Sequence, residues 1–122
     1  MKRTLFLSGV LLSCLFLTSC GGYRCEITAA VTPATATADH NASAPGNQMQ
    51  FSIKSAVTGG CPLVRDKIGS WSTSDAVNTT ISNQAPAEGL ATCVNATSNP
   101  VMITNNGDFR GHAIAPATLT CN

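Results

Sequence analysis

Aromatic and charged side chains are scarce in this sequence. Phe, Trp and Tyr make up 5% of the residues, and Asp, Glu, Lys and Arg make up 11%. Basic and acidic residues nearly balance, at seven against six. A near-neutral chain lacks the basic patch that nucleic-acid binding requires, so we expect no nucleic-acid partner. Thr, Ser and Asn are abundant instead, which favours strands and turns over long helices.

The sequence also lacks the short motifs on which common enzymes and metal sites are built. It has no Gly-x-Ser-x-Gly nucleophile elbow and no carboxylate pair patterned for glycoside hydrolysis. It has no Cys-x-x-Cys pair, which argues against a zinc knuckle or a thioredoxin-like redox site. We therefore expect a protein that is not an enzyme and that holds no metal or cofactor.

The N-terminal segment has the layout of a secretory signal. Lys2 and Arg3 precede an apolar run over residues 5–17, and small residues follow the run. The run is shorter than the roughly 20 residues of a membrane-spanning helix, so we expect no retained transmembrane helix. An ordinary signal peptide is one interpretation of this layout.

The end of that segment, Leu-Thr-Ser-Cys at residues 17–20, resembles a bacterial lipobox. The resemblance implies that residues 1–19 are a lipoprotein signal peptide and that Cys20 carries a lipid, with residues 20–25 as a short tether. Several acyl chains would hold the protein on a membrane. It also implies the bacterial cell envelope, and the outer membrane in preference to the inner. A competing box ends at Cys14 but leaves a shorter apolar run.

Four of the six cysteines remain if Cys14 leaves with the signal and Cys20 takes a lipid. In a small exported domain, four cysteines predict two disulfides, and their number alone allows three pairings. The four are Cys25, Cys61, Cys93 and Cys121.

Alternation of apolar and polar residues dominates the rest of the chain. It is clear over residues 25–31, and clearest where Met49, Phe51 and Ile53 share one face of a strand. Further strands are expected at 64–71, 77–81, 90–94, 101–104 and 117–121. About seven short strands at regular spacing predict an all-β sandwich of two antiparallel sheets.

Turn signals separate these strands. Pro33 ends the first strand, and the residues from 34 to 47 are expected to form a loop with Pro45-Gly46 as a turn. Asn-Asn-Gly-Asp at residues 105–108 predicts a hairpin turn, because Asn-Gly favours positive φ.

Around Trp71 the sequence resembles the group 2 bacterial immunoglobulin-like domains, which are the modules of intimin- and invasin-type adhesins. The stretches that carry the resemblance are Val31-Thr32-Pro33, Gln50-Phe51, Trp71-Ser72-Thr73-Ser74-Asp75, Ile81-Ser82 and Gly89-Leu90-Ala91-Thr92. The resemblance implies an immunoglobulin-like sandwich over residues 26–122. Trp71, with Phe51 and Ile53, is then expected to lie in the core between the sheets.

The topology implied by this resemblance also favours one disulfide pairing. Strands that run alternately up and down would place Cys25 and Cys61 at one end of the domain, and Cys93 and Cys121 at the other. Because bridged Cα atoms lie within about 7 Å of each other, the resemblance implies the disulfides Cys25–Cys61 and Cys93–Cys121.

Two histidines and three aspartates are the remaining candidates for a ligand site. His40 and His112 lack the nearby Cys and Met of a copper centre. Asp66, Asp75 and Asp108 are isolated in sequence, whereas calcium takes six to eight oxygens from clustered groups. We expect no metal at these positions, and we expect Asp75 to organise the turn after the tryptophan.

The sequence therefore predicts a non-catalytic, membrane-anchored lipoprotein whose immunoglobulin-like module contacts another protein or the cell wall, as an adhesin would. The membrane is one partner, through Cys20, and the oligomeric state is open. Loops at residues 39–47 and 84–89 are the candidate contact surfaces, since loops on rigid scaffolds carry function. The alternative is a periplasmic lipoprotein that binds a small ligand or a metal through His40, His112 or the aspartates.

Overall fold

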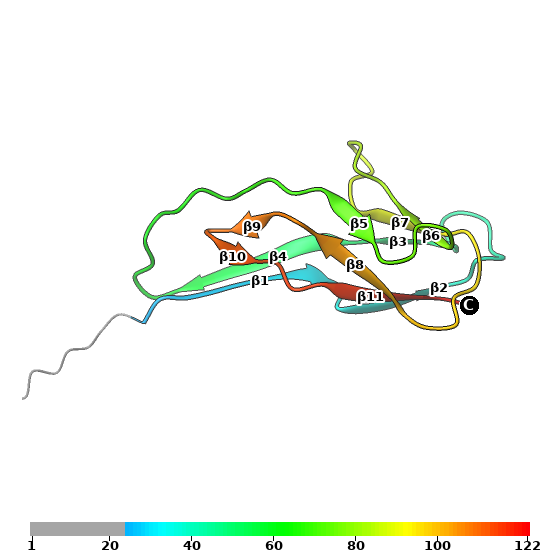
Figure 1. Cartoon of the computed structure of the whole chain (residues 1–122), viewed down its shortest axis with the longest axis horizontal. Coiled ribbons are helices and arrows are strands. Elements are labelled where there is room, and N and C mark those ends of the chain that lie inside the picture. The colour runs from blue at the N-terminus through cyan, green and yellow to red at the C-terminus, as the bar shows by residue number, and fades with distance from the viewer. Residues whose placement is uncertain (1–23) are drawn as a thin grey trace, which may run out of the picture.

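The computed structural model describes residues 24–122, and all of their regular structure is β-strand (Figure 1). The strands are β1 (Glu26–Thr32), β2 (Thr35–Ala38), β3 (Gln48–Gln50), β4 (Ser52–Thr58), β5 (Trp71–Thr73), β6 (Thr79–Ile81), β7 (Leu90–Cys93), β8 (Val101–Asn105), β9 (Asp108–Phe109), β10 (His112–Ala113) and β11 (Ala117–Cys121). None of the segments described here is a helix of the length and apolar character needed to cross a membrane. The predicted signal peptide and Cys20 lie outside the described residues.

One sheet of the sandwich is built from β1, β4, β3, β7 and β6. β1 pairs with β4, β3 with β7, and β7 with β6, all antiparallel. β3 and β4 are two parts of one strand, interrupted only at Phe51. The Phe51 N–H donates to the Gly89 carbonyl at 2.9 Å, which extends the β3–β7 ladder by one residue.

The second sheet has the order β2-β11-β8-β5. Together the two orders match the immunoglobulin sandwich, in which strands A, B, E and D face strands C, F and G. β1 takes the place of strand A, the β3–β4 strand that of B, and β5, β6, β7, β8 and β11 those of C to G. The predicted immunoglobulin-like, all-β fold is therefore confirmed.

The first strand changes sheets, which the sequence did not predict. After Pro33 the chain continues as β2, which pairs with β11 in parallel. The segment from residue 34 to residue 47 is thus not all loop, and the second sheet is not purely antiparallel. Thr and Ala alternate along β2, and Ala38 is buried in the core. Small Ala side chains let this edge strand lie close to the opposite sheet.

Two other predicted elements differ in the structure. Of the expected strand at 64–71, only Trp71 lies in a strand, as the first residue of β5, and the preceding segment makes a single bridge, between Lys67 and Asp108. Residues 105–108 do not form a hairpin turn, since β9 pairs with β10. The hairpin turn lies instead at Arg110 and Gly111, with φ of 50° and 79°, the two positive values that suit a tight hairpin.

The core is packed where the two sheets face each other directly. Phe51, Ile103 and Leu119 are its largest fully buried side chains. Phe51 is thus a core residue as predicted, and Trp71 is half-buried and packs against the core from its edge. The prediction for Ile53 is wrong, because its side chain is 41% exposed. It lies on β4 beyond the region that the second sheet covers.

Both disulfides implied by the resemblance are present. Cys25–Cys61 closes the end of the fold at which the described chain begins, with a Cα–Cα distance of 4.7 Å. Cys93–Cys121 joins β7 to β11, and hence one sheet to the other, with a Cα–Cα distance of 5.6 Å. Cys93 and Cys121 are fully buried, so this second bridge is part of the core.

Candidate functional site

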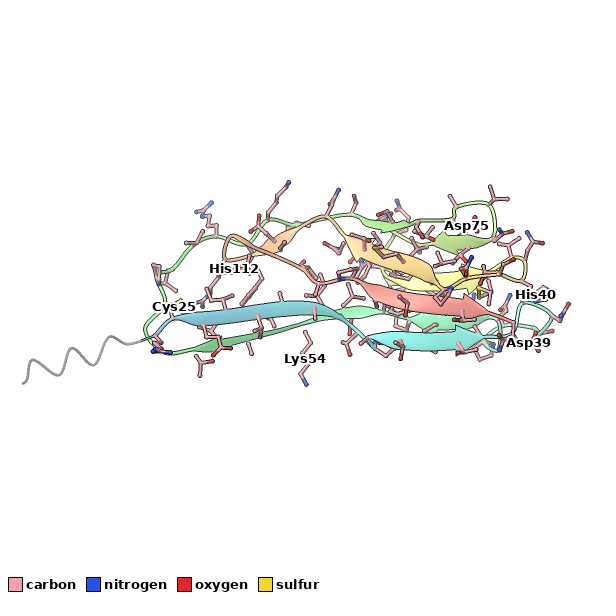
Figure 2. All side chains as sticks on the ribbon, turned by 60° about the horizontal axis from the view of Figure 1, so that its bottom comes forward. Cys25, Asp39, His40, Lys54, Asp75 and His112 are labelled. Atoms are coloured by element: carbon pink, nitrogen blue, oxygen red, sulfur yellow. A yellow bond between two sulfur atoms is a disulfide. The ribbon has the colours of Figure 1, made fainter. Side chains whose placement is uncertain are left out.

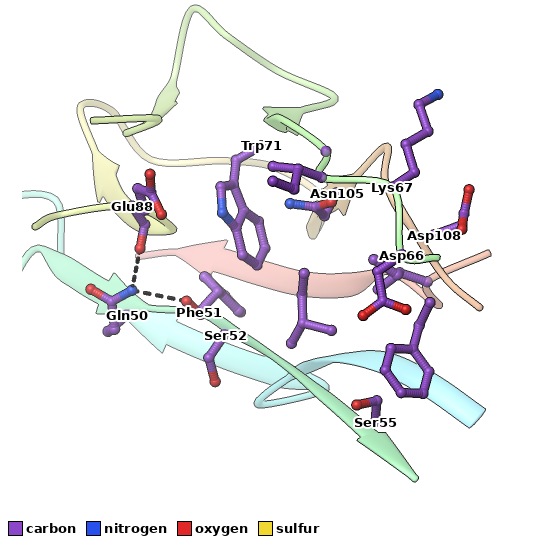
Figure 3. A pocket seen from close by; sticks show the side chains of 15 residues that line it. Gln50, Phe51, Ser52, Ser55, Asp66, Lys67, Trp71, Glu88, Asn105 and Asp108 are labelled. Atoms are coloured by element: carbon purple, nitrogen blue, oxygen red, sulfur yellow. Dashed lines mark hydrogen bonds between the residues drawn. The ribbon is translucent and has the colours of Figure 1, made fainter. Parts of the chain in front are cut away.

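A cleft of about 530 Å³ opens between the two layers in the half of the fold nearest the Cys25–Cys61 bridge. Figure 3 shows it from close by, with β4 below and the segment of residues 66–69 above. The volume falls in the range of roughly 300–1,000 Å³ typical of ligand pockets. Its apolar lining comes from both layers and includes Phe51, Ile53, Trp71, Phe109 and Ile114.

Trp71 forms the wall of the cleft nearest the packed core, with its indole ring directed into the cavity (Figure 3). Its backbone is fixed by one side chain: the Trp71 N–H donates to Asn83 Oδ1 at 2.6 Å, and Asn83 Nδ2 donates to the Trp71 carbonyl at 3.0 Å. Gly89 lies against the ring, and a Cβ there would be 3.1 Å from two ring carbons. The tryptophan is therefore held in one position at the end of the cleft.

Gln50 fixes the same end of the cleft from below. Its Nε2 donates to the Glu88 carbonyl at 2.7 Å and to the Phe51 carbonyl at 2.8 Å (Figure 3). These bonds tie the turn at residues 84–89 to the β3–β4 strand. One of the two loops predicted as a contact surface thus borders the cleft.

The other predicted loop lies elsewhere. Residues 39–47 follow β2 at the far end of the fold, where Figure 2 labels Asp39 and His40. The backbone N–H of His40 donates to the Asn122 carbonyl at 3.0 Å, and the ring Nδ1 of His40 also contacts that oxygen. This loop packs on the C-terminal residue and takes no part in the cleft.

Polar groups line the outer rim of the cleft. Asp66 Oδ1 accepts a hydrogen bond from the Arg110 N–H, and Asp108 Oδ1 accepts one from the Gly111 N–H, both at 3.0 Å. The charged side chains along the lining are Asp66, Lys67, Glu88 and Asp108, three carboxylates and one ammonium group. Lys67 and Asp108 both extend away from the cavity (Figure 3), and the rim carries three acidic groups against one basic group.

The other candidate ligands do not assemble. His40 and His112 lie at opposite ends of the fold (Figure 2). Asp66 and Asp108, isolated in sequence, do meet at the rim, but Asp75 lies apart. Within residues 24–122 no group of three or more His, Cys, Asp or Glu side chains could hold a metal ion.

Asp75 organises a turn, as its place after the tryptophan predicted. Its carboxylate accepts hydrogen bonds from the N–H of Val77 at 3.2 Å, and from the N–H and side chain of Asn78 at 3.1 and 2.7 Å. The side-chain bond from Asn78, followed by the backbone bonds, holds the pKa of Asp75 below its usual value. These bonds are local to the turn at residues 75–78.

The open edge of β4 is the feature of this site that the sequence did not reveal. β4 is seven residues long, all of them exposed, and within residues 24–122 its only strand neighbour is β1. Alternation placed Ile53 on one face with Met49 and Phe51, but alternation cannot show whether a second strand covers the edge. Ile53 and Val57, at 41% and 39% exposure, show instead that the second sheet does not cover this part of β4.

The β1 ladder shows which backbone groups of β4 are unpaired. In an antiparallel pair, successive residues direct their N–H and C=O groups to opposite sides of the strand. On β1, the Val31 N–H donates to the Ala115 carbonyl, and the Ala29 carbonyl accepts from the Ala115 N–H. Odd-numbered residues of β1 therefore face away from β4, and even-numbered ones such as Ala30, opposite Lys54, bond to it.

Even-numbered residues of β1 lie opposite even-numbered residues of β4, so the even-numbered residues of β4 bond to β1. The N–H and C=O groups of Ile53, Ser55 and Val57 then point to the open edge. Phe51 agrees with this assignment, since its N–H points to the β7 side. β7 begins only at Leu90, so beyond Gly89 the position beside β4 is empty within the described chain.

Comparison with known proteins gives no family for the chain: no protein-family model matches it, and no curated protein matches it. The function must therefore be argued from the residues and from the cleft.

Proposed function

We propose that this protein is a non-catalytic lipoprotein of the bacterial envelope, held by a lipid on Cys20, whose immunoglobulin-like domain binds another protein or the cell wall. The observation that carries the proposal is the position of the cleft relative to the predicted anchor. The described chain begins at one tip of the sandwich (Figure 1), and Arg24 is only four residues from Cys20.

This spacing sets where a partner would be met. Four residues span at most about 14 Å when fully extended, so a lipid on Cys20 would keep the near end of the domain beside the bilayer. The Cys25–Cys61 bridge and the cleft lie at this near end, whereas residues 39–47 lie at the far end. A cleft beside the membrane suits a partner in the envelope better than a distant surface.

Two cysteine variants test the anchor. Cys20→Ala should release the protein from the membrane fraction and abolish incorporation of a labelled fatty acid, whereas Cys14→Ala should leave both unchanged. Protease treatment of intact cells then separates surface from periplasm. Loss of the domain from intact cells places it outside and favours adhesion, and survival until the outer membrane is opened places it in the periplasm. An unaltered membrane fraction for Cys20→Ala would sink the proposal.

The cleft also favours a second candidate, a periplasmic lipoprotein that binds a small apolar ligand. Its volume and its tryptophan wall are those of a ligand pocket. Native mass spectrometry of the protein purified from its own cells decides between the two. A bound small molecule that is lost in Trp71→Ala, and kept in the far-end variant His40→Ala, would favour the ligand carrier.

A further inference from the structure

We infer that the empty position beside β4 is a binding slot for one extended segment of a partner protein, which adds to the sheet as a strand. This inference rests on the proposed function and names the kind of partner that the domain takes. It starts from the unpaired N–H and C=O groups of Ile53, Ser55 and Val57. In strand addition, main-chain hydrogen bonds supply the affinity and alternate side chains supply the specificity.

The slot has the dimensions of a single strand. β4 contributes seven residues, or about 23 Å of open edge. One end of the slot is closed by the turn at Glu88 and Gly89, which the Gln50 side chain ties down. The segment of residues 66–69 lies over it as the opposite wall of the cleft (Figure 3). A strand placed there would continue the line of β7.

The slot selects for alternating side chains. Along β4, Ile53 and Ser55 line the cleft, and Lys54 faces outward from the opposite side (Figure 2). An added strand would place every second side chain among Ile53, Trp71 and Phe109, which are apolar. The side chains between them would remain in solvent. The occupant is therefore an extended segment with apolar residues at alternate positions.

Charge on the rim adds a second preference. Three carboxylates and one ammonium group border the cleft. Opposite charges at the margins of an interface favour encounter and register. A segment with Lys or Arg flanking its alternating apolar residues fits this rim better than an acidic one.

A second copy of this chain fits the slot less well. Two β4 edges would pair antiparallel about a two-fold axis, which places the same face of both ribbons on the same side. Residues 66–69 of one copy would then collide with residues 66–69 and Phe109 of the other copy, above the two paired β4 strands. A single extended segment brings no second layer with it.

The test uses the full chain in detergent and a synthetic peptide of sequence KVTVTVTVK, with the permuted peptide KVVVVTTTK as control. The readout is amide hydrogen exchange followed by nuclear magnetic resonance. Without peptide, the amides of Ile53, Ser55 and Val57 should exchange fast, because they have no acceptor among the described residues. The alternating peptide should protect these three amides, and the permuted peptide should not.

Substitutions at one position separate backbone from side chain. Ser55→Pro removes an N–H that the fold does not use, so the domain should keep both disulfides and its fold. It should weaken peptide binding about tenfold or more, because it removes a main-chain donor and blocks the edge. Ser55→Ala retains the N–H and should bind as the wild type does. If Ser55→Pro does not fold, Ile53→Lys, at an exposed side chain, serves instead and should also weaken binding.

Three outcomes would overturn the inference. One is the absence of protection at about 1 mM alternating peptide, which corresponds to affinities too weak for a specific site. Another is equal binding of the permuted peptide, since the slot would then not read alternation. The third is self-association that Ser55→Pro abolishes, which would assign the edge to a second copy. None of these outcomes changes whether Cys20→Ala releases the protein from the membrane fraction. Failure of this inference can therefore be distinguished from failure of the proposed function.

Discussion

The two disulfides should differ sharply in what they contribute to stability, although they close loops of similar length. We compare the double variants Cys93→Ala/Cys121→Ala and Cys25→Ala/Cys61→Ala. The first pair is buried and joins the two sheets, whereas the second lies at an exposed end where β1 and β4 are already paired. Loop closure affects both pairs, but only the first leaves a void in the core.

Loop entropy gives the common part of the effect. The bridged residues are 36 and 28 apart in sequence. These separations correspond to about 3.8 and about 3.6 kcal/mol of unfolding free energy at 25 °C. Replacing two buried sulfur atoms adds two voids near the size of a methyl group, at about 1 kcal/mol each. We therefore expect a loss of about 5–6 kcal/mol for Cys93–Cys121 and at most about 4 kcal/mol for Cys25–Cys61.

Urea denaturation followed by tryptophan fluorescence measures both losses, because Trp71 packs against the core edge. A loss of 5 kcal/mol is the whole stability of many domains, so a Cys93→Ala/Cys121→Ala protein that is unfolded in buffer agrees with the prediction. Equal losses, or a larger loss for Cys25→Ala/Cys61→Ala, would refute the reasoning that burial separates the two bridges. A dithiothreitol titration of the wild type should likewise reduce Cys25–Cys61 first.

Three further predictions concern single residues. Leu119→Ala should lower the free energy of unfolding by about 2–5 kcal/mol, while Ile68→Ala, at a side chain 96% exposed, should change it by less than about 0.5 kcal/mol in urea denaturation. Gly89→Ala should cost more than about 2 kcal/mol, because its Cβ would overlap the neighbouring strand, whereas Gly111→Ala, at a similar φ but in open space, should cost about 1 kcal/mol. The pKa of Asp75 in the fold is lower than its ordinary value of 3.8. Its ionised carboxylate therefore stabilises the protein above that pH, and this contribution is lost as the pH falls through the folded pKa. Stability measured against pH should fall less steeply in acid for Asp75→Asn than for the wild type, and identical curves would contradict this role.

The strands that the sequence predicted well are those with strong apolar contrast. Residues 26–32 and 117–121 largely alternate between apolar and polar side chains and include Ile27, Val31 and Leu119, and both are strands in the structure. β2 was missed because Thr and Ala differ little in polarity, and because a Pro precedes the segment. Its pairing with β11 is a contact between chain segments more than 80 residues apart, to which local patterns are blind.

The hairpin was placed at the wrong turn for a related reason. Asn106-Gly107 carries the usual signature, yet the positive φ values occur at Arg110 and Gly111. Instead, the Asn105 side chain accepts the Gly107 N–H at 2.9 Å, and the Asn106 side chain accepts the Ser70 N–H at 2.7 Å. These asparagines therefore help to hold the chain that follows residues 66–69 and do not form a hairpin turn. Their tertiary contacts override the local preference for a turn.

The core prediction that is wrong, the one for Ile53, has a physical cause in the layer above the strand. Ile53 lies two residues from the fully buried Phe51, on the same face of the same strand, yet it is 41% exposed. Alternation assigns both to the inner face, and that assignment is right. What differs is the layer above: the second sheet covers Phe51, whereas over Ile53 the chain offers only the irregular segment of residues 66–69. Exposed apolar area on an inner face costs free energy in the isolated domain, at about 25 cal/mol per Å². A strand in the empty position would recover it, so the same residue that departs from the core prediction supplies part of the driving force for strand addition.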